Sequence, residues 1–365
     1  MLNRFALSLD MSLLNHYQVS CRIQEGDIVS GSNNEQFARI FSMPPAMVPY
    51  VDLVVSEQEK ELVLQMEGQS LSKDQIAEFM GMGLDETAHL LKEMTKREVL
   101  IRSIQGTQVR YAAGRFYANM DYWTAYETGS WSCLPKWTRN AVYEWQLQAF
   151  IKLHTPSFEK IAQDPDVWLQ MKNRDVLLLD EALELVAAAE YVCVLPCPCK
   201  TTLQPGSPVI EGSMRLGARA KETLEIGQGR GLTASEAKAH LLMLDRMGLV
   251  HTGPHFWREH DPDLEWVSHG NCNIAYSFPF QAGLRLGLAK KYPRVHYVAQ
   301  MEQERCQGCG TCVGRCPFGA VYHDGTTISL HGTSRRSIVL DPAKCFGCGL
   351  CATSCPEEAI AMEPL

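Results

Sequence analysis

The sequence predicts an α+β protein whose N-terminal and middle regions are mostly helical and whose C-terminal part is a small cysteine-rich domain. Helix-capping pairs precede apolar repeats of helical spacing, as at Ser72 with Gln75 and at Thr233 with Glu236. A hairpin pattern covers residues 99–111. One cysteine spacing occurs twice near the C-terminus. The 365 residues, of which 45% are hydrophobic, are enough for two or three domains with buried cores.

The N-terminal part divides into an arm and a first domain. Residues 1–50 are expected to form the arm, which ends at the connector Met43-Pro44-Pro45. In residues 51–118, capping pairs and apolar spacing predict three successive helices, the third from about Asp85 to Lys96, followed by the hairpin. Three helices and a hairpin are the parts of a winged helix, so we predict a winged-helix-like domain.

The charge of this domain argues against nucleic-acid binding. Residues 56–115 contain ten acidic and eight basic side chains. A protein that reads DNA usually presents a net basic face, because contacts to phosphates dominate the affinity. We therefore favour a structural or protein-docking role over DNA binding.

Residues 119–295 are predicted to form a helical middle domain. Apolar periodicity indicates helices over residues 142–153 and 180–191, and the clearest helical pattern runs from Thr233 to Gly248. Aromatic residues are frequent in residues 116–180, as is typical of a core or an interface.

Residues 296–365 are predicted to form a dicluster domain. The run Cys-x2-Cys-x2-Cys-x3-Cys-Pro occurs twice, and each position of the second copy lies 39 residues after its counterpart. This run holds cubane [4Fe–4S] clusters in bacterial ferredoxins, where the fourth cysteine ligates the other cluster. The first cluster is therefore assigned to Cys306, Cys309, Cys312 and Cys355. The second cluster is assigned to Cys345, Cys348, Cys351 and Cys316.

Two other uses of paired cysteines fit the pattern less well. Structural zinc sites place two Cys-x2-Cys knuckles apart, and disulfides are typical of secreted domains. The chain start lacks the apolar core and cleavage site of a secretory leader, and no apolar stretch is long enough to span a membrane. We therefore expect a cytoplasmic protein, and oxygen-labile clusters suggest an anaerobic or microaerobic source.

Four further cysteines raise a second chemical question. Prolines stiffen the loop that carries Cys197 and Cys199, and Cys272 lies between two asparagines. Cys193 could supply a further ligand. Three interpretations stay open at this point: a third metal site that holds zinc or a cluster, reduced structural cysteines, or a redox-active thiol pair.

Most of the chain resembles a family of proteins from anaerobic bacteria and archaea that join a winged-helix-like part to a C-terminal dicluster ferredoxin module. The middle domain of that family carries a Cys-x-Cys-Arg element, a helix that ends in Gly-Leu-Val-His, and an Asn-Cys-Cys element. The matching stretches here are residues 196–200, 246–251 and 271–273. Lys200 replaces the arginine and Asn273 replaces the second cysteine, which leaves fewer ligands for a third cluster. The resemblance implies two clusters and no particular substrate.

Two all-cysteine clusters side by side suit one-electron transfer at low potential and leave no open iron position for a substrate. We therefore predict an electron carrier, or an electron-delivering subunit of a cytoplasmic oxidoreductase, with the N-terminal two-thirds as a docking platform. The formal net charge is −8, and residues 301–365 carry seven acidic and five basic side chains. The expected partner is a redox protein with a basic docking surface.

Two alternative functions are kept. The middle domain could act as an enzyme on a small substrate with electrons from the clusters, or the chain could be an iron–sulfur redox-sensing regulator with a winged helix. Retention on DNA would favour the regulator. The sequence does not predict an oligomeric state.

Overall fold

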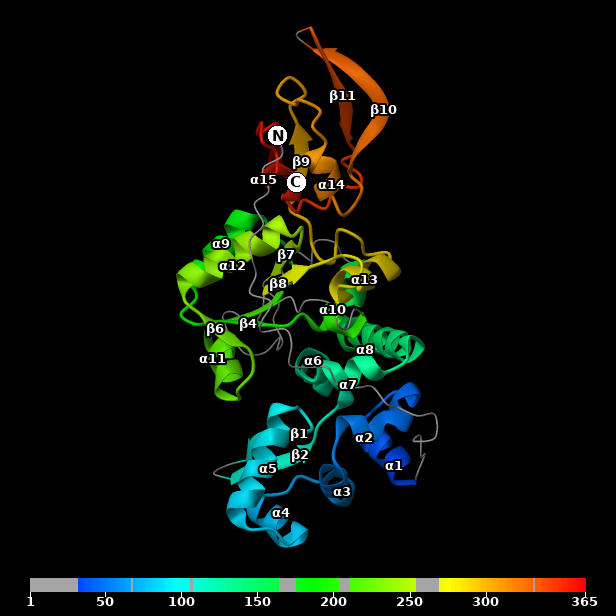
Figure 1. Cartoon of the computed structure of the whole chain (residues 1–365), viewed down its shortest axis with the longest axis vertical. Helices are drawn as coiled ribbons and strands as arrows, with labels where there is room; N and C mark the ends of the chain where they lie inside the picture. The colour runs from blue at the N-terminus through cyan, green and yellow to red at the C-terminus, as the bar shows by residue number, and fades with distance from the viewer. Residues whose placement is uncertain are drawn as a thin grey trace. The chain divides into compact units, whose positions relative to one another are not determined.

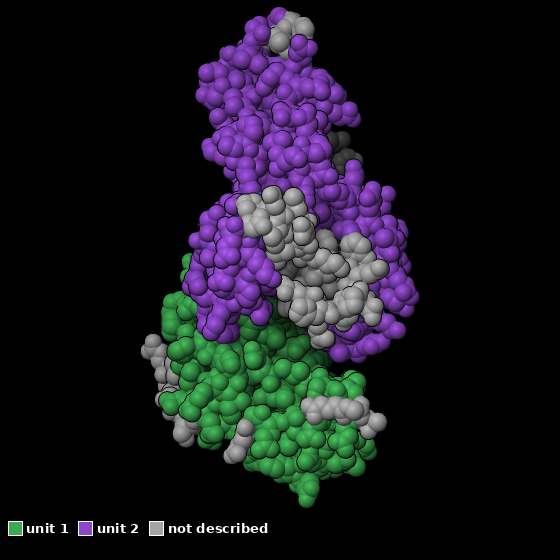
Figure 2. Space-filling view, turned by 180° about the vertical axis from the view of Figure 1, so that it is seen from behind, with its two compact units in different colours: residues 1–142, 204–207 green, residues 143–203, 208–365 purple. Residues whose placement is uncertain are grey.

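The computed structural model of the chain describes residues 32–66, 68–105, 108–163, 175–203, 211–253, 269–330 and 332–365 (Figure 1). These residues contain both helices and strands, which confirms the α+β class. The described residues fall into two compact units, of which unit 1 extends to Val142 and unit 2 begins at Tyr143 (Figure 2).

Unit 1 is built mainly from helices. It begins with α1 (Ser32–Ile40), the 3-10 helix η2 (Pro45–Tyr50) and α2 (Val51–Val54). It continues through α3 (Glu57–Met66), α4 (Lys73–Met80), α5 (Leu84–Lys96), β1 (Leu100–Gln105), β2 (Gln108–Ala113), α6 (Phe116–Tyr126) and α7 (Thr128–Cys133). Helix α8 (Lys136–Gln163) begins in unit 1 and continues into unit 2.

The three helices and the hairpin expected in residues 51–118 are present as α3 to α5 and as the antiparallel pair β1–β2. The Ser72 hydroxyl accepts from the Gln75 N–H at 3.3 Å, and the Gln75 side chain accepts from the Ser72 N–H at 2.9 Å, so the capping box starts α4. Leu71 forms an antiparallel bridge with Tyr111. The assignment of a winged helix itself stays a prediction.

Aromatic side chains form the core of unit 1. Phe37, Phe41, Phe116, Trp123 and Trp131 are at most 1% exposed. Their rings contact one another in that order, with centroids 5.2 to 6.3 Å apart. Such pairs stabilise a core beyond the burial of their area. The expectation that aromatics here serve the core is therefore correct for Phe116, Trp123 and Trp131.

The middle part of the chain contains a six-stranded antiparallel sheet in the order β3-β7-β8-β5-β4-β6. Its strands are β3 (Asp175–Val176), β4 (Val192–Leu195), β5 (Ser213–Leu216), β6 (Arg230–Leu232), β7 (Val250–Gly253) and β8 (His269–Cys272). The prediction of a mostly helical middle region therefore missed this sheet. These strands have two to four residues, which is too short for an alternating pattern to be recognised.

Five helices follow these strands or lie between them in the chain. They are α9 (Leu179–Ala188), α10 (Pro198–Leu203), α11 (Gly217–Glu225), α12 (Ala234–Arg246) and α13 (Phe278–Arg285). Helices α9 and α12 lie side by side (Figure 1). They bury Ala182, Val186, Ala237 and Leu241 against strand residues that include Val194. The expected capping box of Thr233 with Glu236 starts α12.

Unit 2 comprises residues 143–203 and 208–365. The domain boundaries expected at 118/119 and 295/296 stay predictions. One apolar core of unit 2 spans the middle region and the cysteine-rich region. It joins Val250 and Phe280 of the middle region to Cys348 and Leu350 of the cysteine-rich region. No helix in the described part of the chain is both long and apolar enough to cross a membrane.

Candidate metal centres

The cysteine-rich region is closed by its first and last strands. Strand β9 (Tyr297–Met301) pairs antiparallel with β12 (Ile360–Pro364). Between them, each cysteine run forms a loop followed by a short helix, α14 (Thr311–Arg315) or α15 (Leu350–Thr353). The segment between the two runs forms a long hairpin of β10 (Val321–Leu330) and β11 (Thr333–Leu340). Each half thus consists of a loop and a short helix, and the long hairpin separates the two halves.

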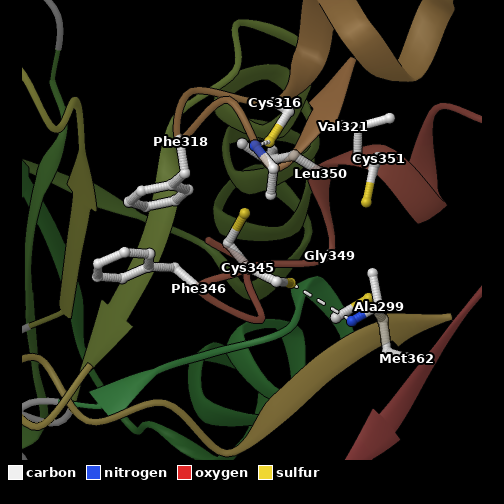
Figure 3. Close-up of a pocket in the computed structure, with 12 residues that line it drawn as sticks. Ala299, Cys316, Phe318, Val321, Cys345, Phe346, Gly349, Leu350, Cys351 and Met362 are labelled. Atoms are coloured by element: carbon white, nitrogen blue, oxygen red, sulfur yellow. Dashed lines mark hydrogen bonds between the residues drawn. The ribbon is translucent and has the colours of Figure 1, made fainter. Parts of the chain in front are cut away.

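The cysteines line two separate pockets, each with members from both runs. The first pocket is lined by Cys306, Cys309, Cys312 and Cys355 and encloses about 330 Å³, counting space open to solvent. The second pocket is lined by Cys316, Cys345, Cys348 and Cys351 and encloses about 310 Å³ on the same measure. Figure 3 shows Cys316, Cys345 and Cys351 around the second pocket. Each group of four is the group that the crossover rule assigns to one cluster.

Backbone amides point at the sulfur atoms in the same way in both halves. The Gly308 N–H donates to Cys306 Sγ and the Gly347 N–H donates to Cys345 Sγ, both at 3.4 Å. The Ala320 N–H donates to Cys316 Sγ and the Ala359 N–H donates to Cys355 Sγ, both at 3.3 Å. Hydrogen bonds of this kind stabilise the thiolate form, which is the form that ligates a metal. Two groups of four thiols with directed amides fit two iron–sulfur clusters.

Glycine is required in both cysteine loops. Gly308 has φ +67° and Gly347 has φ +61°. A Cβ on Gly308 would lie 2.6 Å from the Arg336 carbonyl oxygen, and one on Gly347 would lie 2.2 Å from the Tyr297 carbonyl oxygen. Both neighbours are backbone atoms within strands and have little freedom to move.

Replacing Gly347 by alanine is expected to destabilise unit 2 by more than about 2 kcal/mol, because strain at positive φ adds to the clash with strand β9. Thermal unfolding and iron content of anaerobically purified protein would measure the loss. Gly314→Ala is the matched control, since its Cβ would meet no atom within 4 Å in helix α14, and its effect should stay within about 1 kcal/mol. Equal stability of the two variants would contradict the prediction.

The two pockets differ in exposure. In the first pocket Cys309 is exposed, and its hydrogen bonds with Thr311 lower the pKa of its thiol. In the second pocket Cys345, Cys348 and Cys351 are all buried. Burial is the main cause that raises the pKa of Cys348, and it raises that of Cys351 to about 12. The first pocket therefore reaches the surface at Cys309, and the second is the more enclosed.

Two arginines of the long hairpin contact the loop of the first pocket. Arg336 Nε donates to the Gly308 carbonyl at 3.1 Å, and its Nη2 donates to the Cys309 carbonyl at 2.6 Å. Arg335 donates to the Gln303 carbonyl. The hairpin thus holds this loop in place and brings a positive charge to the more exposed pocket.

Two aromatic rings and the apolar core that contains Val250 and Phe280 lie beside the second pocket. Phe318 and Phe346 are stacked, with centroids 4.1 Å apart and ring planes 7° apart, and both line the pocket (Figure 3). They pack against a core that contains both Cys348 and Cys272. The middle region thus meets the cysteine-rich region at the second pocket.

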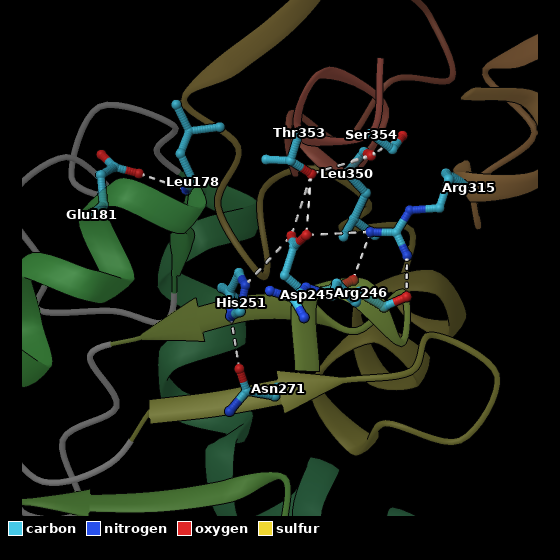
Figure 4. Close-up of polar contacts among 10 residues, drawn as sticks. All are labelled: Leu178, Glu181, Asp245, Arg246, His251, Asn271, Arg315, Leu350, Thr353 and Ser354. Atoms are coloured by element: carbon cyan, nitrogen blue, oxygen red, sulfur yellow. Dashed lines mark hydrogen bonds and ion pairs between the residues drawn. The ribbon is translucent and has the colours of Figure 1, made fainter. Parts of the chain in front are cut away.

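A polar network also joins the middle region to the two short helices. Arg315 Nη2 donates to Asp245 Oδ2 at 3.3 Å, and Thr353 Oγ1 donates to the same oxygen at 3.2 Å (Figure 4). On the other side, His251 Nε2 lies 3.8 Å from Asp245 Oδ1, and its Nδ1 pairs with Asn271 Oδ1 at 2.7 Å. Asp245 therefore contacts α14, α15 and strand β7. Sequence reasoning missed this network, because its members are far apart in the chain.

Three of the four middle-region cysteines are neighbours, and the fourth, Cys193, has different surroundings. The neighbouring Cys197, burial and, to a smaller extent, Cys272 raise the pKa of the Cys199 thiol. Cys193 has other neighbours: its thiol faces the carbonyl oxygens of Val194 at 3.8 Å and Gln228 at 3.9 Å. The structure therefore brings together Cys197, Cys199 and Cys272 but does not place Cys193 with them, because Cys193 points into the interior from strand β4.

Among the described residues, no three His, Cys, Asp or Glu side chains are arranged to hold a single metal ion. This holds for the cysteines of the two pockets as well as for those of the middle region, so the third metal site that the sequence left open for Cys197, Cys199 and Cys272 stays a prediction.

The two cysteine-lined pockets have the ligand sets of an iron–sulfur domain. Residues 297–360 match the family model described as a 4Fe-4S dicluster domain. No curated protein and no solved structure matches the chain. The C-terminal region is therefore an iron–sulfur domain with the capacity for electron transfer.

Proposed function

We propose that the protein holds two [4Fe–4S] clusters and transfers single electrons as a carrier or as the electron-delivering subunit of an oxidoreductase. The first cluster takes Cys306, Cys309, Cys312 and Cys355 as ligands, and the second takes Cys345, Cys348, Cys351 and Cys316. The observation that carries this proposal is the crossing of the two cysteine runs, each of which gives its last cysteine to the other pocket. Bound there, the clusters supply one-electron redox chemistry at low potential.

The surface around the first pocket supports exchange of electrons with a partner. Cys309 is exposed at this pocket. Glu302, Glu304 and Glu358 are exposed and lie close in sequence to cysteines of this pocket, and Glu357 lines the pocket itself. Glu302 and Glu358 each form an exposed ion pair with Arg305. Acidic side chains around an exposed centre attract a partner with a basic docking surface.

A redox titration followed by electron paramagnetic resonance tests the electron-transfer capacity. Anaerobically purified protein should take up about two electrons per chain, one for each cluster. Uptake of a single electron would contradict the two-cluster proposal.

The docking proposal is tested by the rate at which the reduced protein reduces cytochrome c, a basic one-electron acceptor. The rate should fall by about tenfold between low and high salt, because salt screens the attraction. Replacing Glu357 and Glu358 together by glutamine should slow the reaction at low salt, whereas Glu61→Gln on α3 should leave it unchanged. A rate that does not depend on salt would contradict an acidic docking surface.

A DNA-retention assay at low and moderate salt separates this function from that of a redox-sensing regulator. We expect retention at low salt at most, without sequence preference, because residues 56–115 carry more acidic than basic side chains. Selective retention at moderate salt would favour the regulator.

A further inference from the structure

One arginine of the long hairpin has its guanidinium group fixed against the loop of the first pocket. Arg336 donates from Nε to the Gly308 carbonyl at 3.1 Å and from Nη2 to the Cys309 carbonyl at 2.6 Å. A Cβ on Gly310 would lie 3.6 to 3.7 Å from Nη1, Nη2 and Cζ of Arg336, so the guanidinium group also lies beside this glycine. Both Cys309 and Gly310 line the first pocket. The positive charge of Arg336 is therefore held at that pocket.

The backbone of Arg336 is fixed against the same loop. Strand β11 pairs with β10 so that Arg336 lies opposite Thr327. A Cβ on Gly308 would lie 2.6 Å from the Arg336 carbonyl oxygen and 2.9 Å from its backbone nitrogen. The strand can come this close only because residue 308 has no side chain. Backbone and side chain together thus leave the charge little freedom to move away.

The charge of Arg336 is close enough to act on a cluster in the first pocket. Four covalent bonds separate the Cys309 carbonyl oxygen from the Cys309 sulfur, so Arg336 Nη2 lies within about 8 Å of that sulfur. The Debye length at physiological ionic strength is also about 8 Å, so salt screens the charge only in part. Both hydrogen bonds of Arg336 go to neutral carbonyl oxygens, and within the described residues no carboxylate pairs with it.

The second pocket has different surroundings. Apart from its cysteines, it is lined by glycine and apolar side chains. The two basic residues that precede its cysteines in the chain are each paired with a carboxylate: Arg315 with Asp245 at 3.3 Å and Lys344 with Asp341 at 3.5 Å. Burial in apolar surroundings disfavours added negative charge. Reduction is therefore less favourable in the second pocket than beside an unpaired arginine at the surface.

We propose that Arg336 raises the reduction potential of the first cluster and not that of the second, so that a single electron taken up by the protein rests at the exposed pocket. This role rests on the proposed electron transfer. The electron comes from a one-electron reductant and adds one negative charge to the cluster, which the fixed positive charge stabilises. Coulomb's law at about 8 Å, with a dielectric constant between those of a protein surface and water, gives about threefold to tenfold in the equilibrium constant of reduction. For one electron this corresponds to about 30 to 60 mV.

The experiment is a titration of the anaerobically purified full-length protein with dithionite, followed by electron paramagnetic resonance, which gives the midpoint potentials of the two reduction steps. In Arg336→Gln the higher potential should fall by the amount given above, and the lower potential should move by less than half as much. Arg336→Lys keeps the charge, so its higher potential should fall by less than half as much as that of Arg336→Gln. Two unchanged potentials in Arg336→Gln, or a fall of the lower potential alone, would overturn the proposal. Equal falls in the glutamine and lysine variants would also overturn it, because the charge would then not be the cause.

Arg335→Gln is the matched control, because it removes the same charge from the adjacent position of the hairpin. Arg335 donates to the carbonyl of Gln303, which does not line the pocket. Its loss should lower the higher potential by less than half as much as the loss of Arg336, and equal falls would overturn the proposal in favour of the total charge of the hairpin. Glu357→Gln removes a negative charge from the first pocket and should raise the higher potential. A rise of the lower potential alone would overturn the assignment of the higher potential to the first cluster.

Iron content separates this role from a purely structural one. Arg336→Gln should keep about eight iron atoms per chain, because its amide can still donate to a carbonyl of the loop. A loss of about four iron atoms would show that Arg336 serves to hold the loop, and would overturn the proposal. A failure of the two-cluster proposal would be recognised separately, as a low iron content of the unaltered protein. Unshifted potentials in a variant that holds both clusters would refute the role of Arg336 alone.

Discussion

Replacing Cys316 and Cys351 together by alanine is expected to remove only one cluster, so that iron falls from about eight to about four atoms per chain. Replacing Cys312 and Cys316 together is expected to remove both clusters and nearly all the iron. The reason is that Cys316 and Cys351 line the same pocket, whereas Cys312 and Cys316 belong to one run but line different pockets. Assays of iron and acid-labile sulfide on anaerobically purified variants measure the result.

The opposite pattern would show that each run holds its own cluster. In that case the pair Cys312 and Cys316 would remove about four iron atoms, and the pair Cys316 and Cys351 would remove all of them. Cys193→Ala is the control for the loss of a buried thiol, because it lies in unit 2 outside both pockets. It should retain about eight iron atoms per chain.

The second large effect is expected at Asp245, which joins the middle region to both short helices. Asp245→Ala should reduce the stability of the surrounding structure by about 2–4 kcal/mol, because it leaves Arg315 without its carboxylate and removes one of the acceptors of Thr353. The side chains of Arg315 and Asp245 are only 17% and 9% exposed, so water replaces little of the lost interaction.

Native-state hydrogen exchange would localise this loss. Amides of α12, α14 and α15 should lose protection by at least about thirtyfold, whereas those of α3 in unit 1 should keep theirs. Asp245→Asn retains an oxygen that can accept from Thr353 and should cost less than the alanine variant. Unchanged protection in α14 and α15 would show that the network does not hold the cysteine-rich region to the sheet.

The local signals in the sequence predicted local structure well. The capping boxes at Ser72 and Thr233 start helices, because a cap is satisfied by residues within one turn. The spacing of each cysteine run places its first three cysteines on one tight loop, and these three line one pocket. The family match to residues 297–360 supports the same iron–sulfur domain.

The tertiary structure decided what depends on residues far apart in the chain. The sheet of the middle region joins strands of two to four residues, and so short a segment carries no readable period. The separation of Cys193 from Cys197 follows from the direction in which strand β4 presents its side chain, which chain distance does not reveal. The contact of Asp245 with Arg315 and Thr353 spans 70 and 108 positions in the chain. The sequence by itself determined which three cysteines share each loop, because this follows from spacing within a loop. The position of each run's last cysteine at the other pocket depends on how the two halves fold together. Only the tertiary structure decided how the cysteine-rich region packs on the sheet. Apolar burial and charge pairing between distant segments depend on the shape of the folded chain, so local sequence patterns do not predict them.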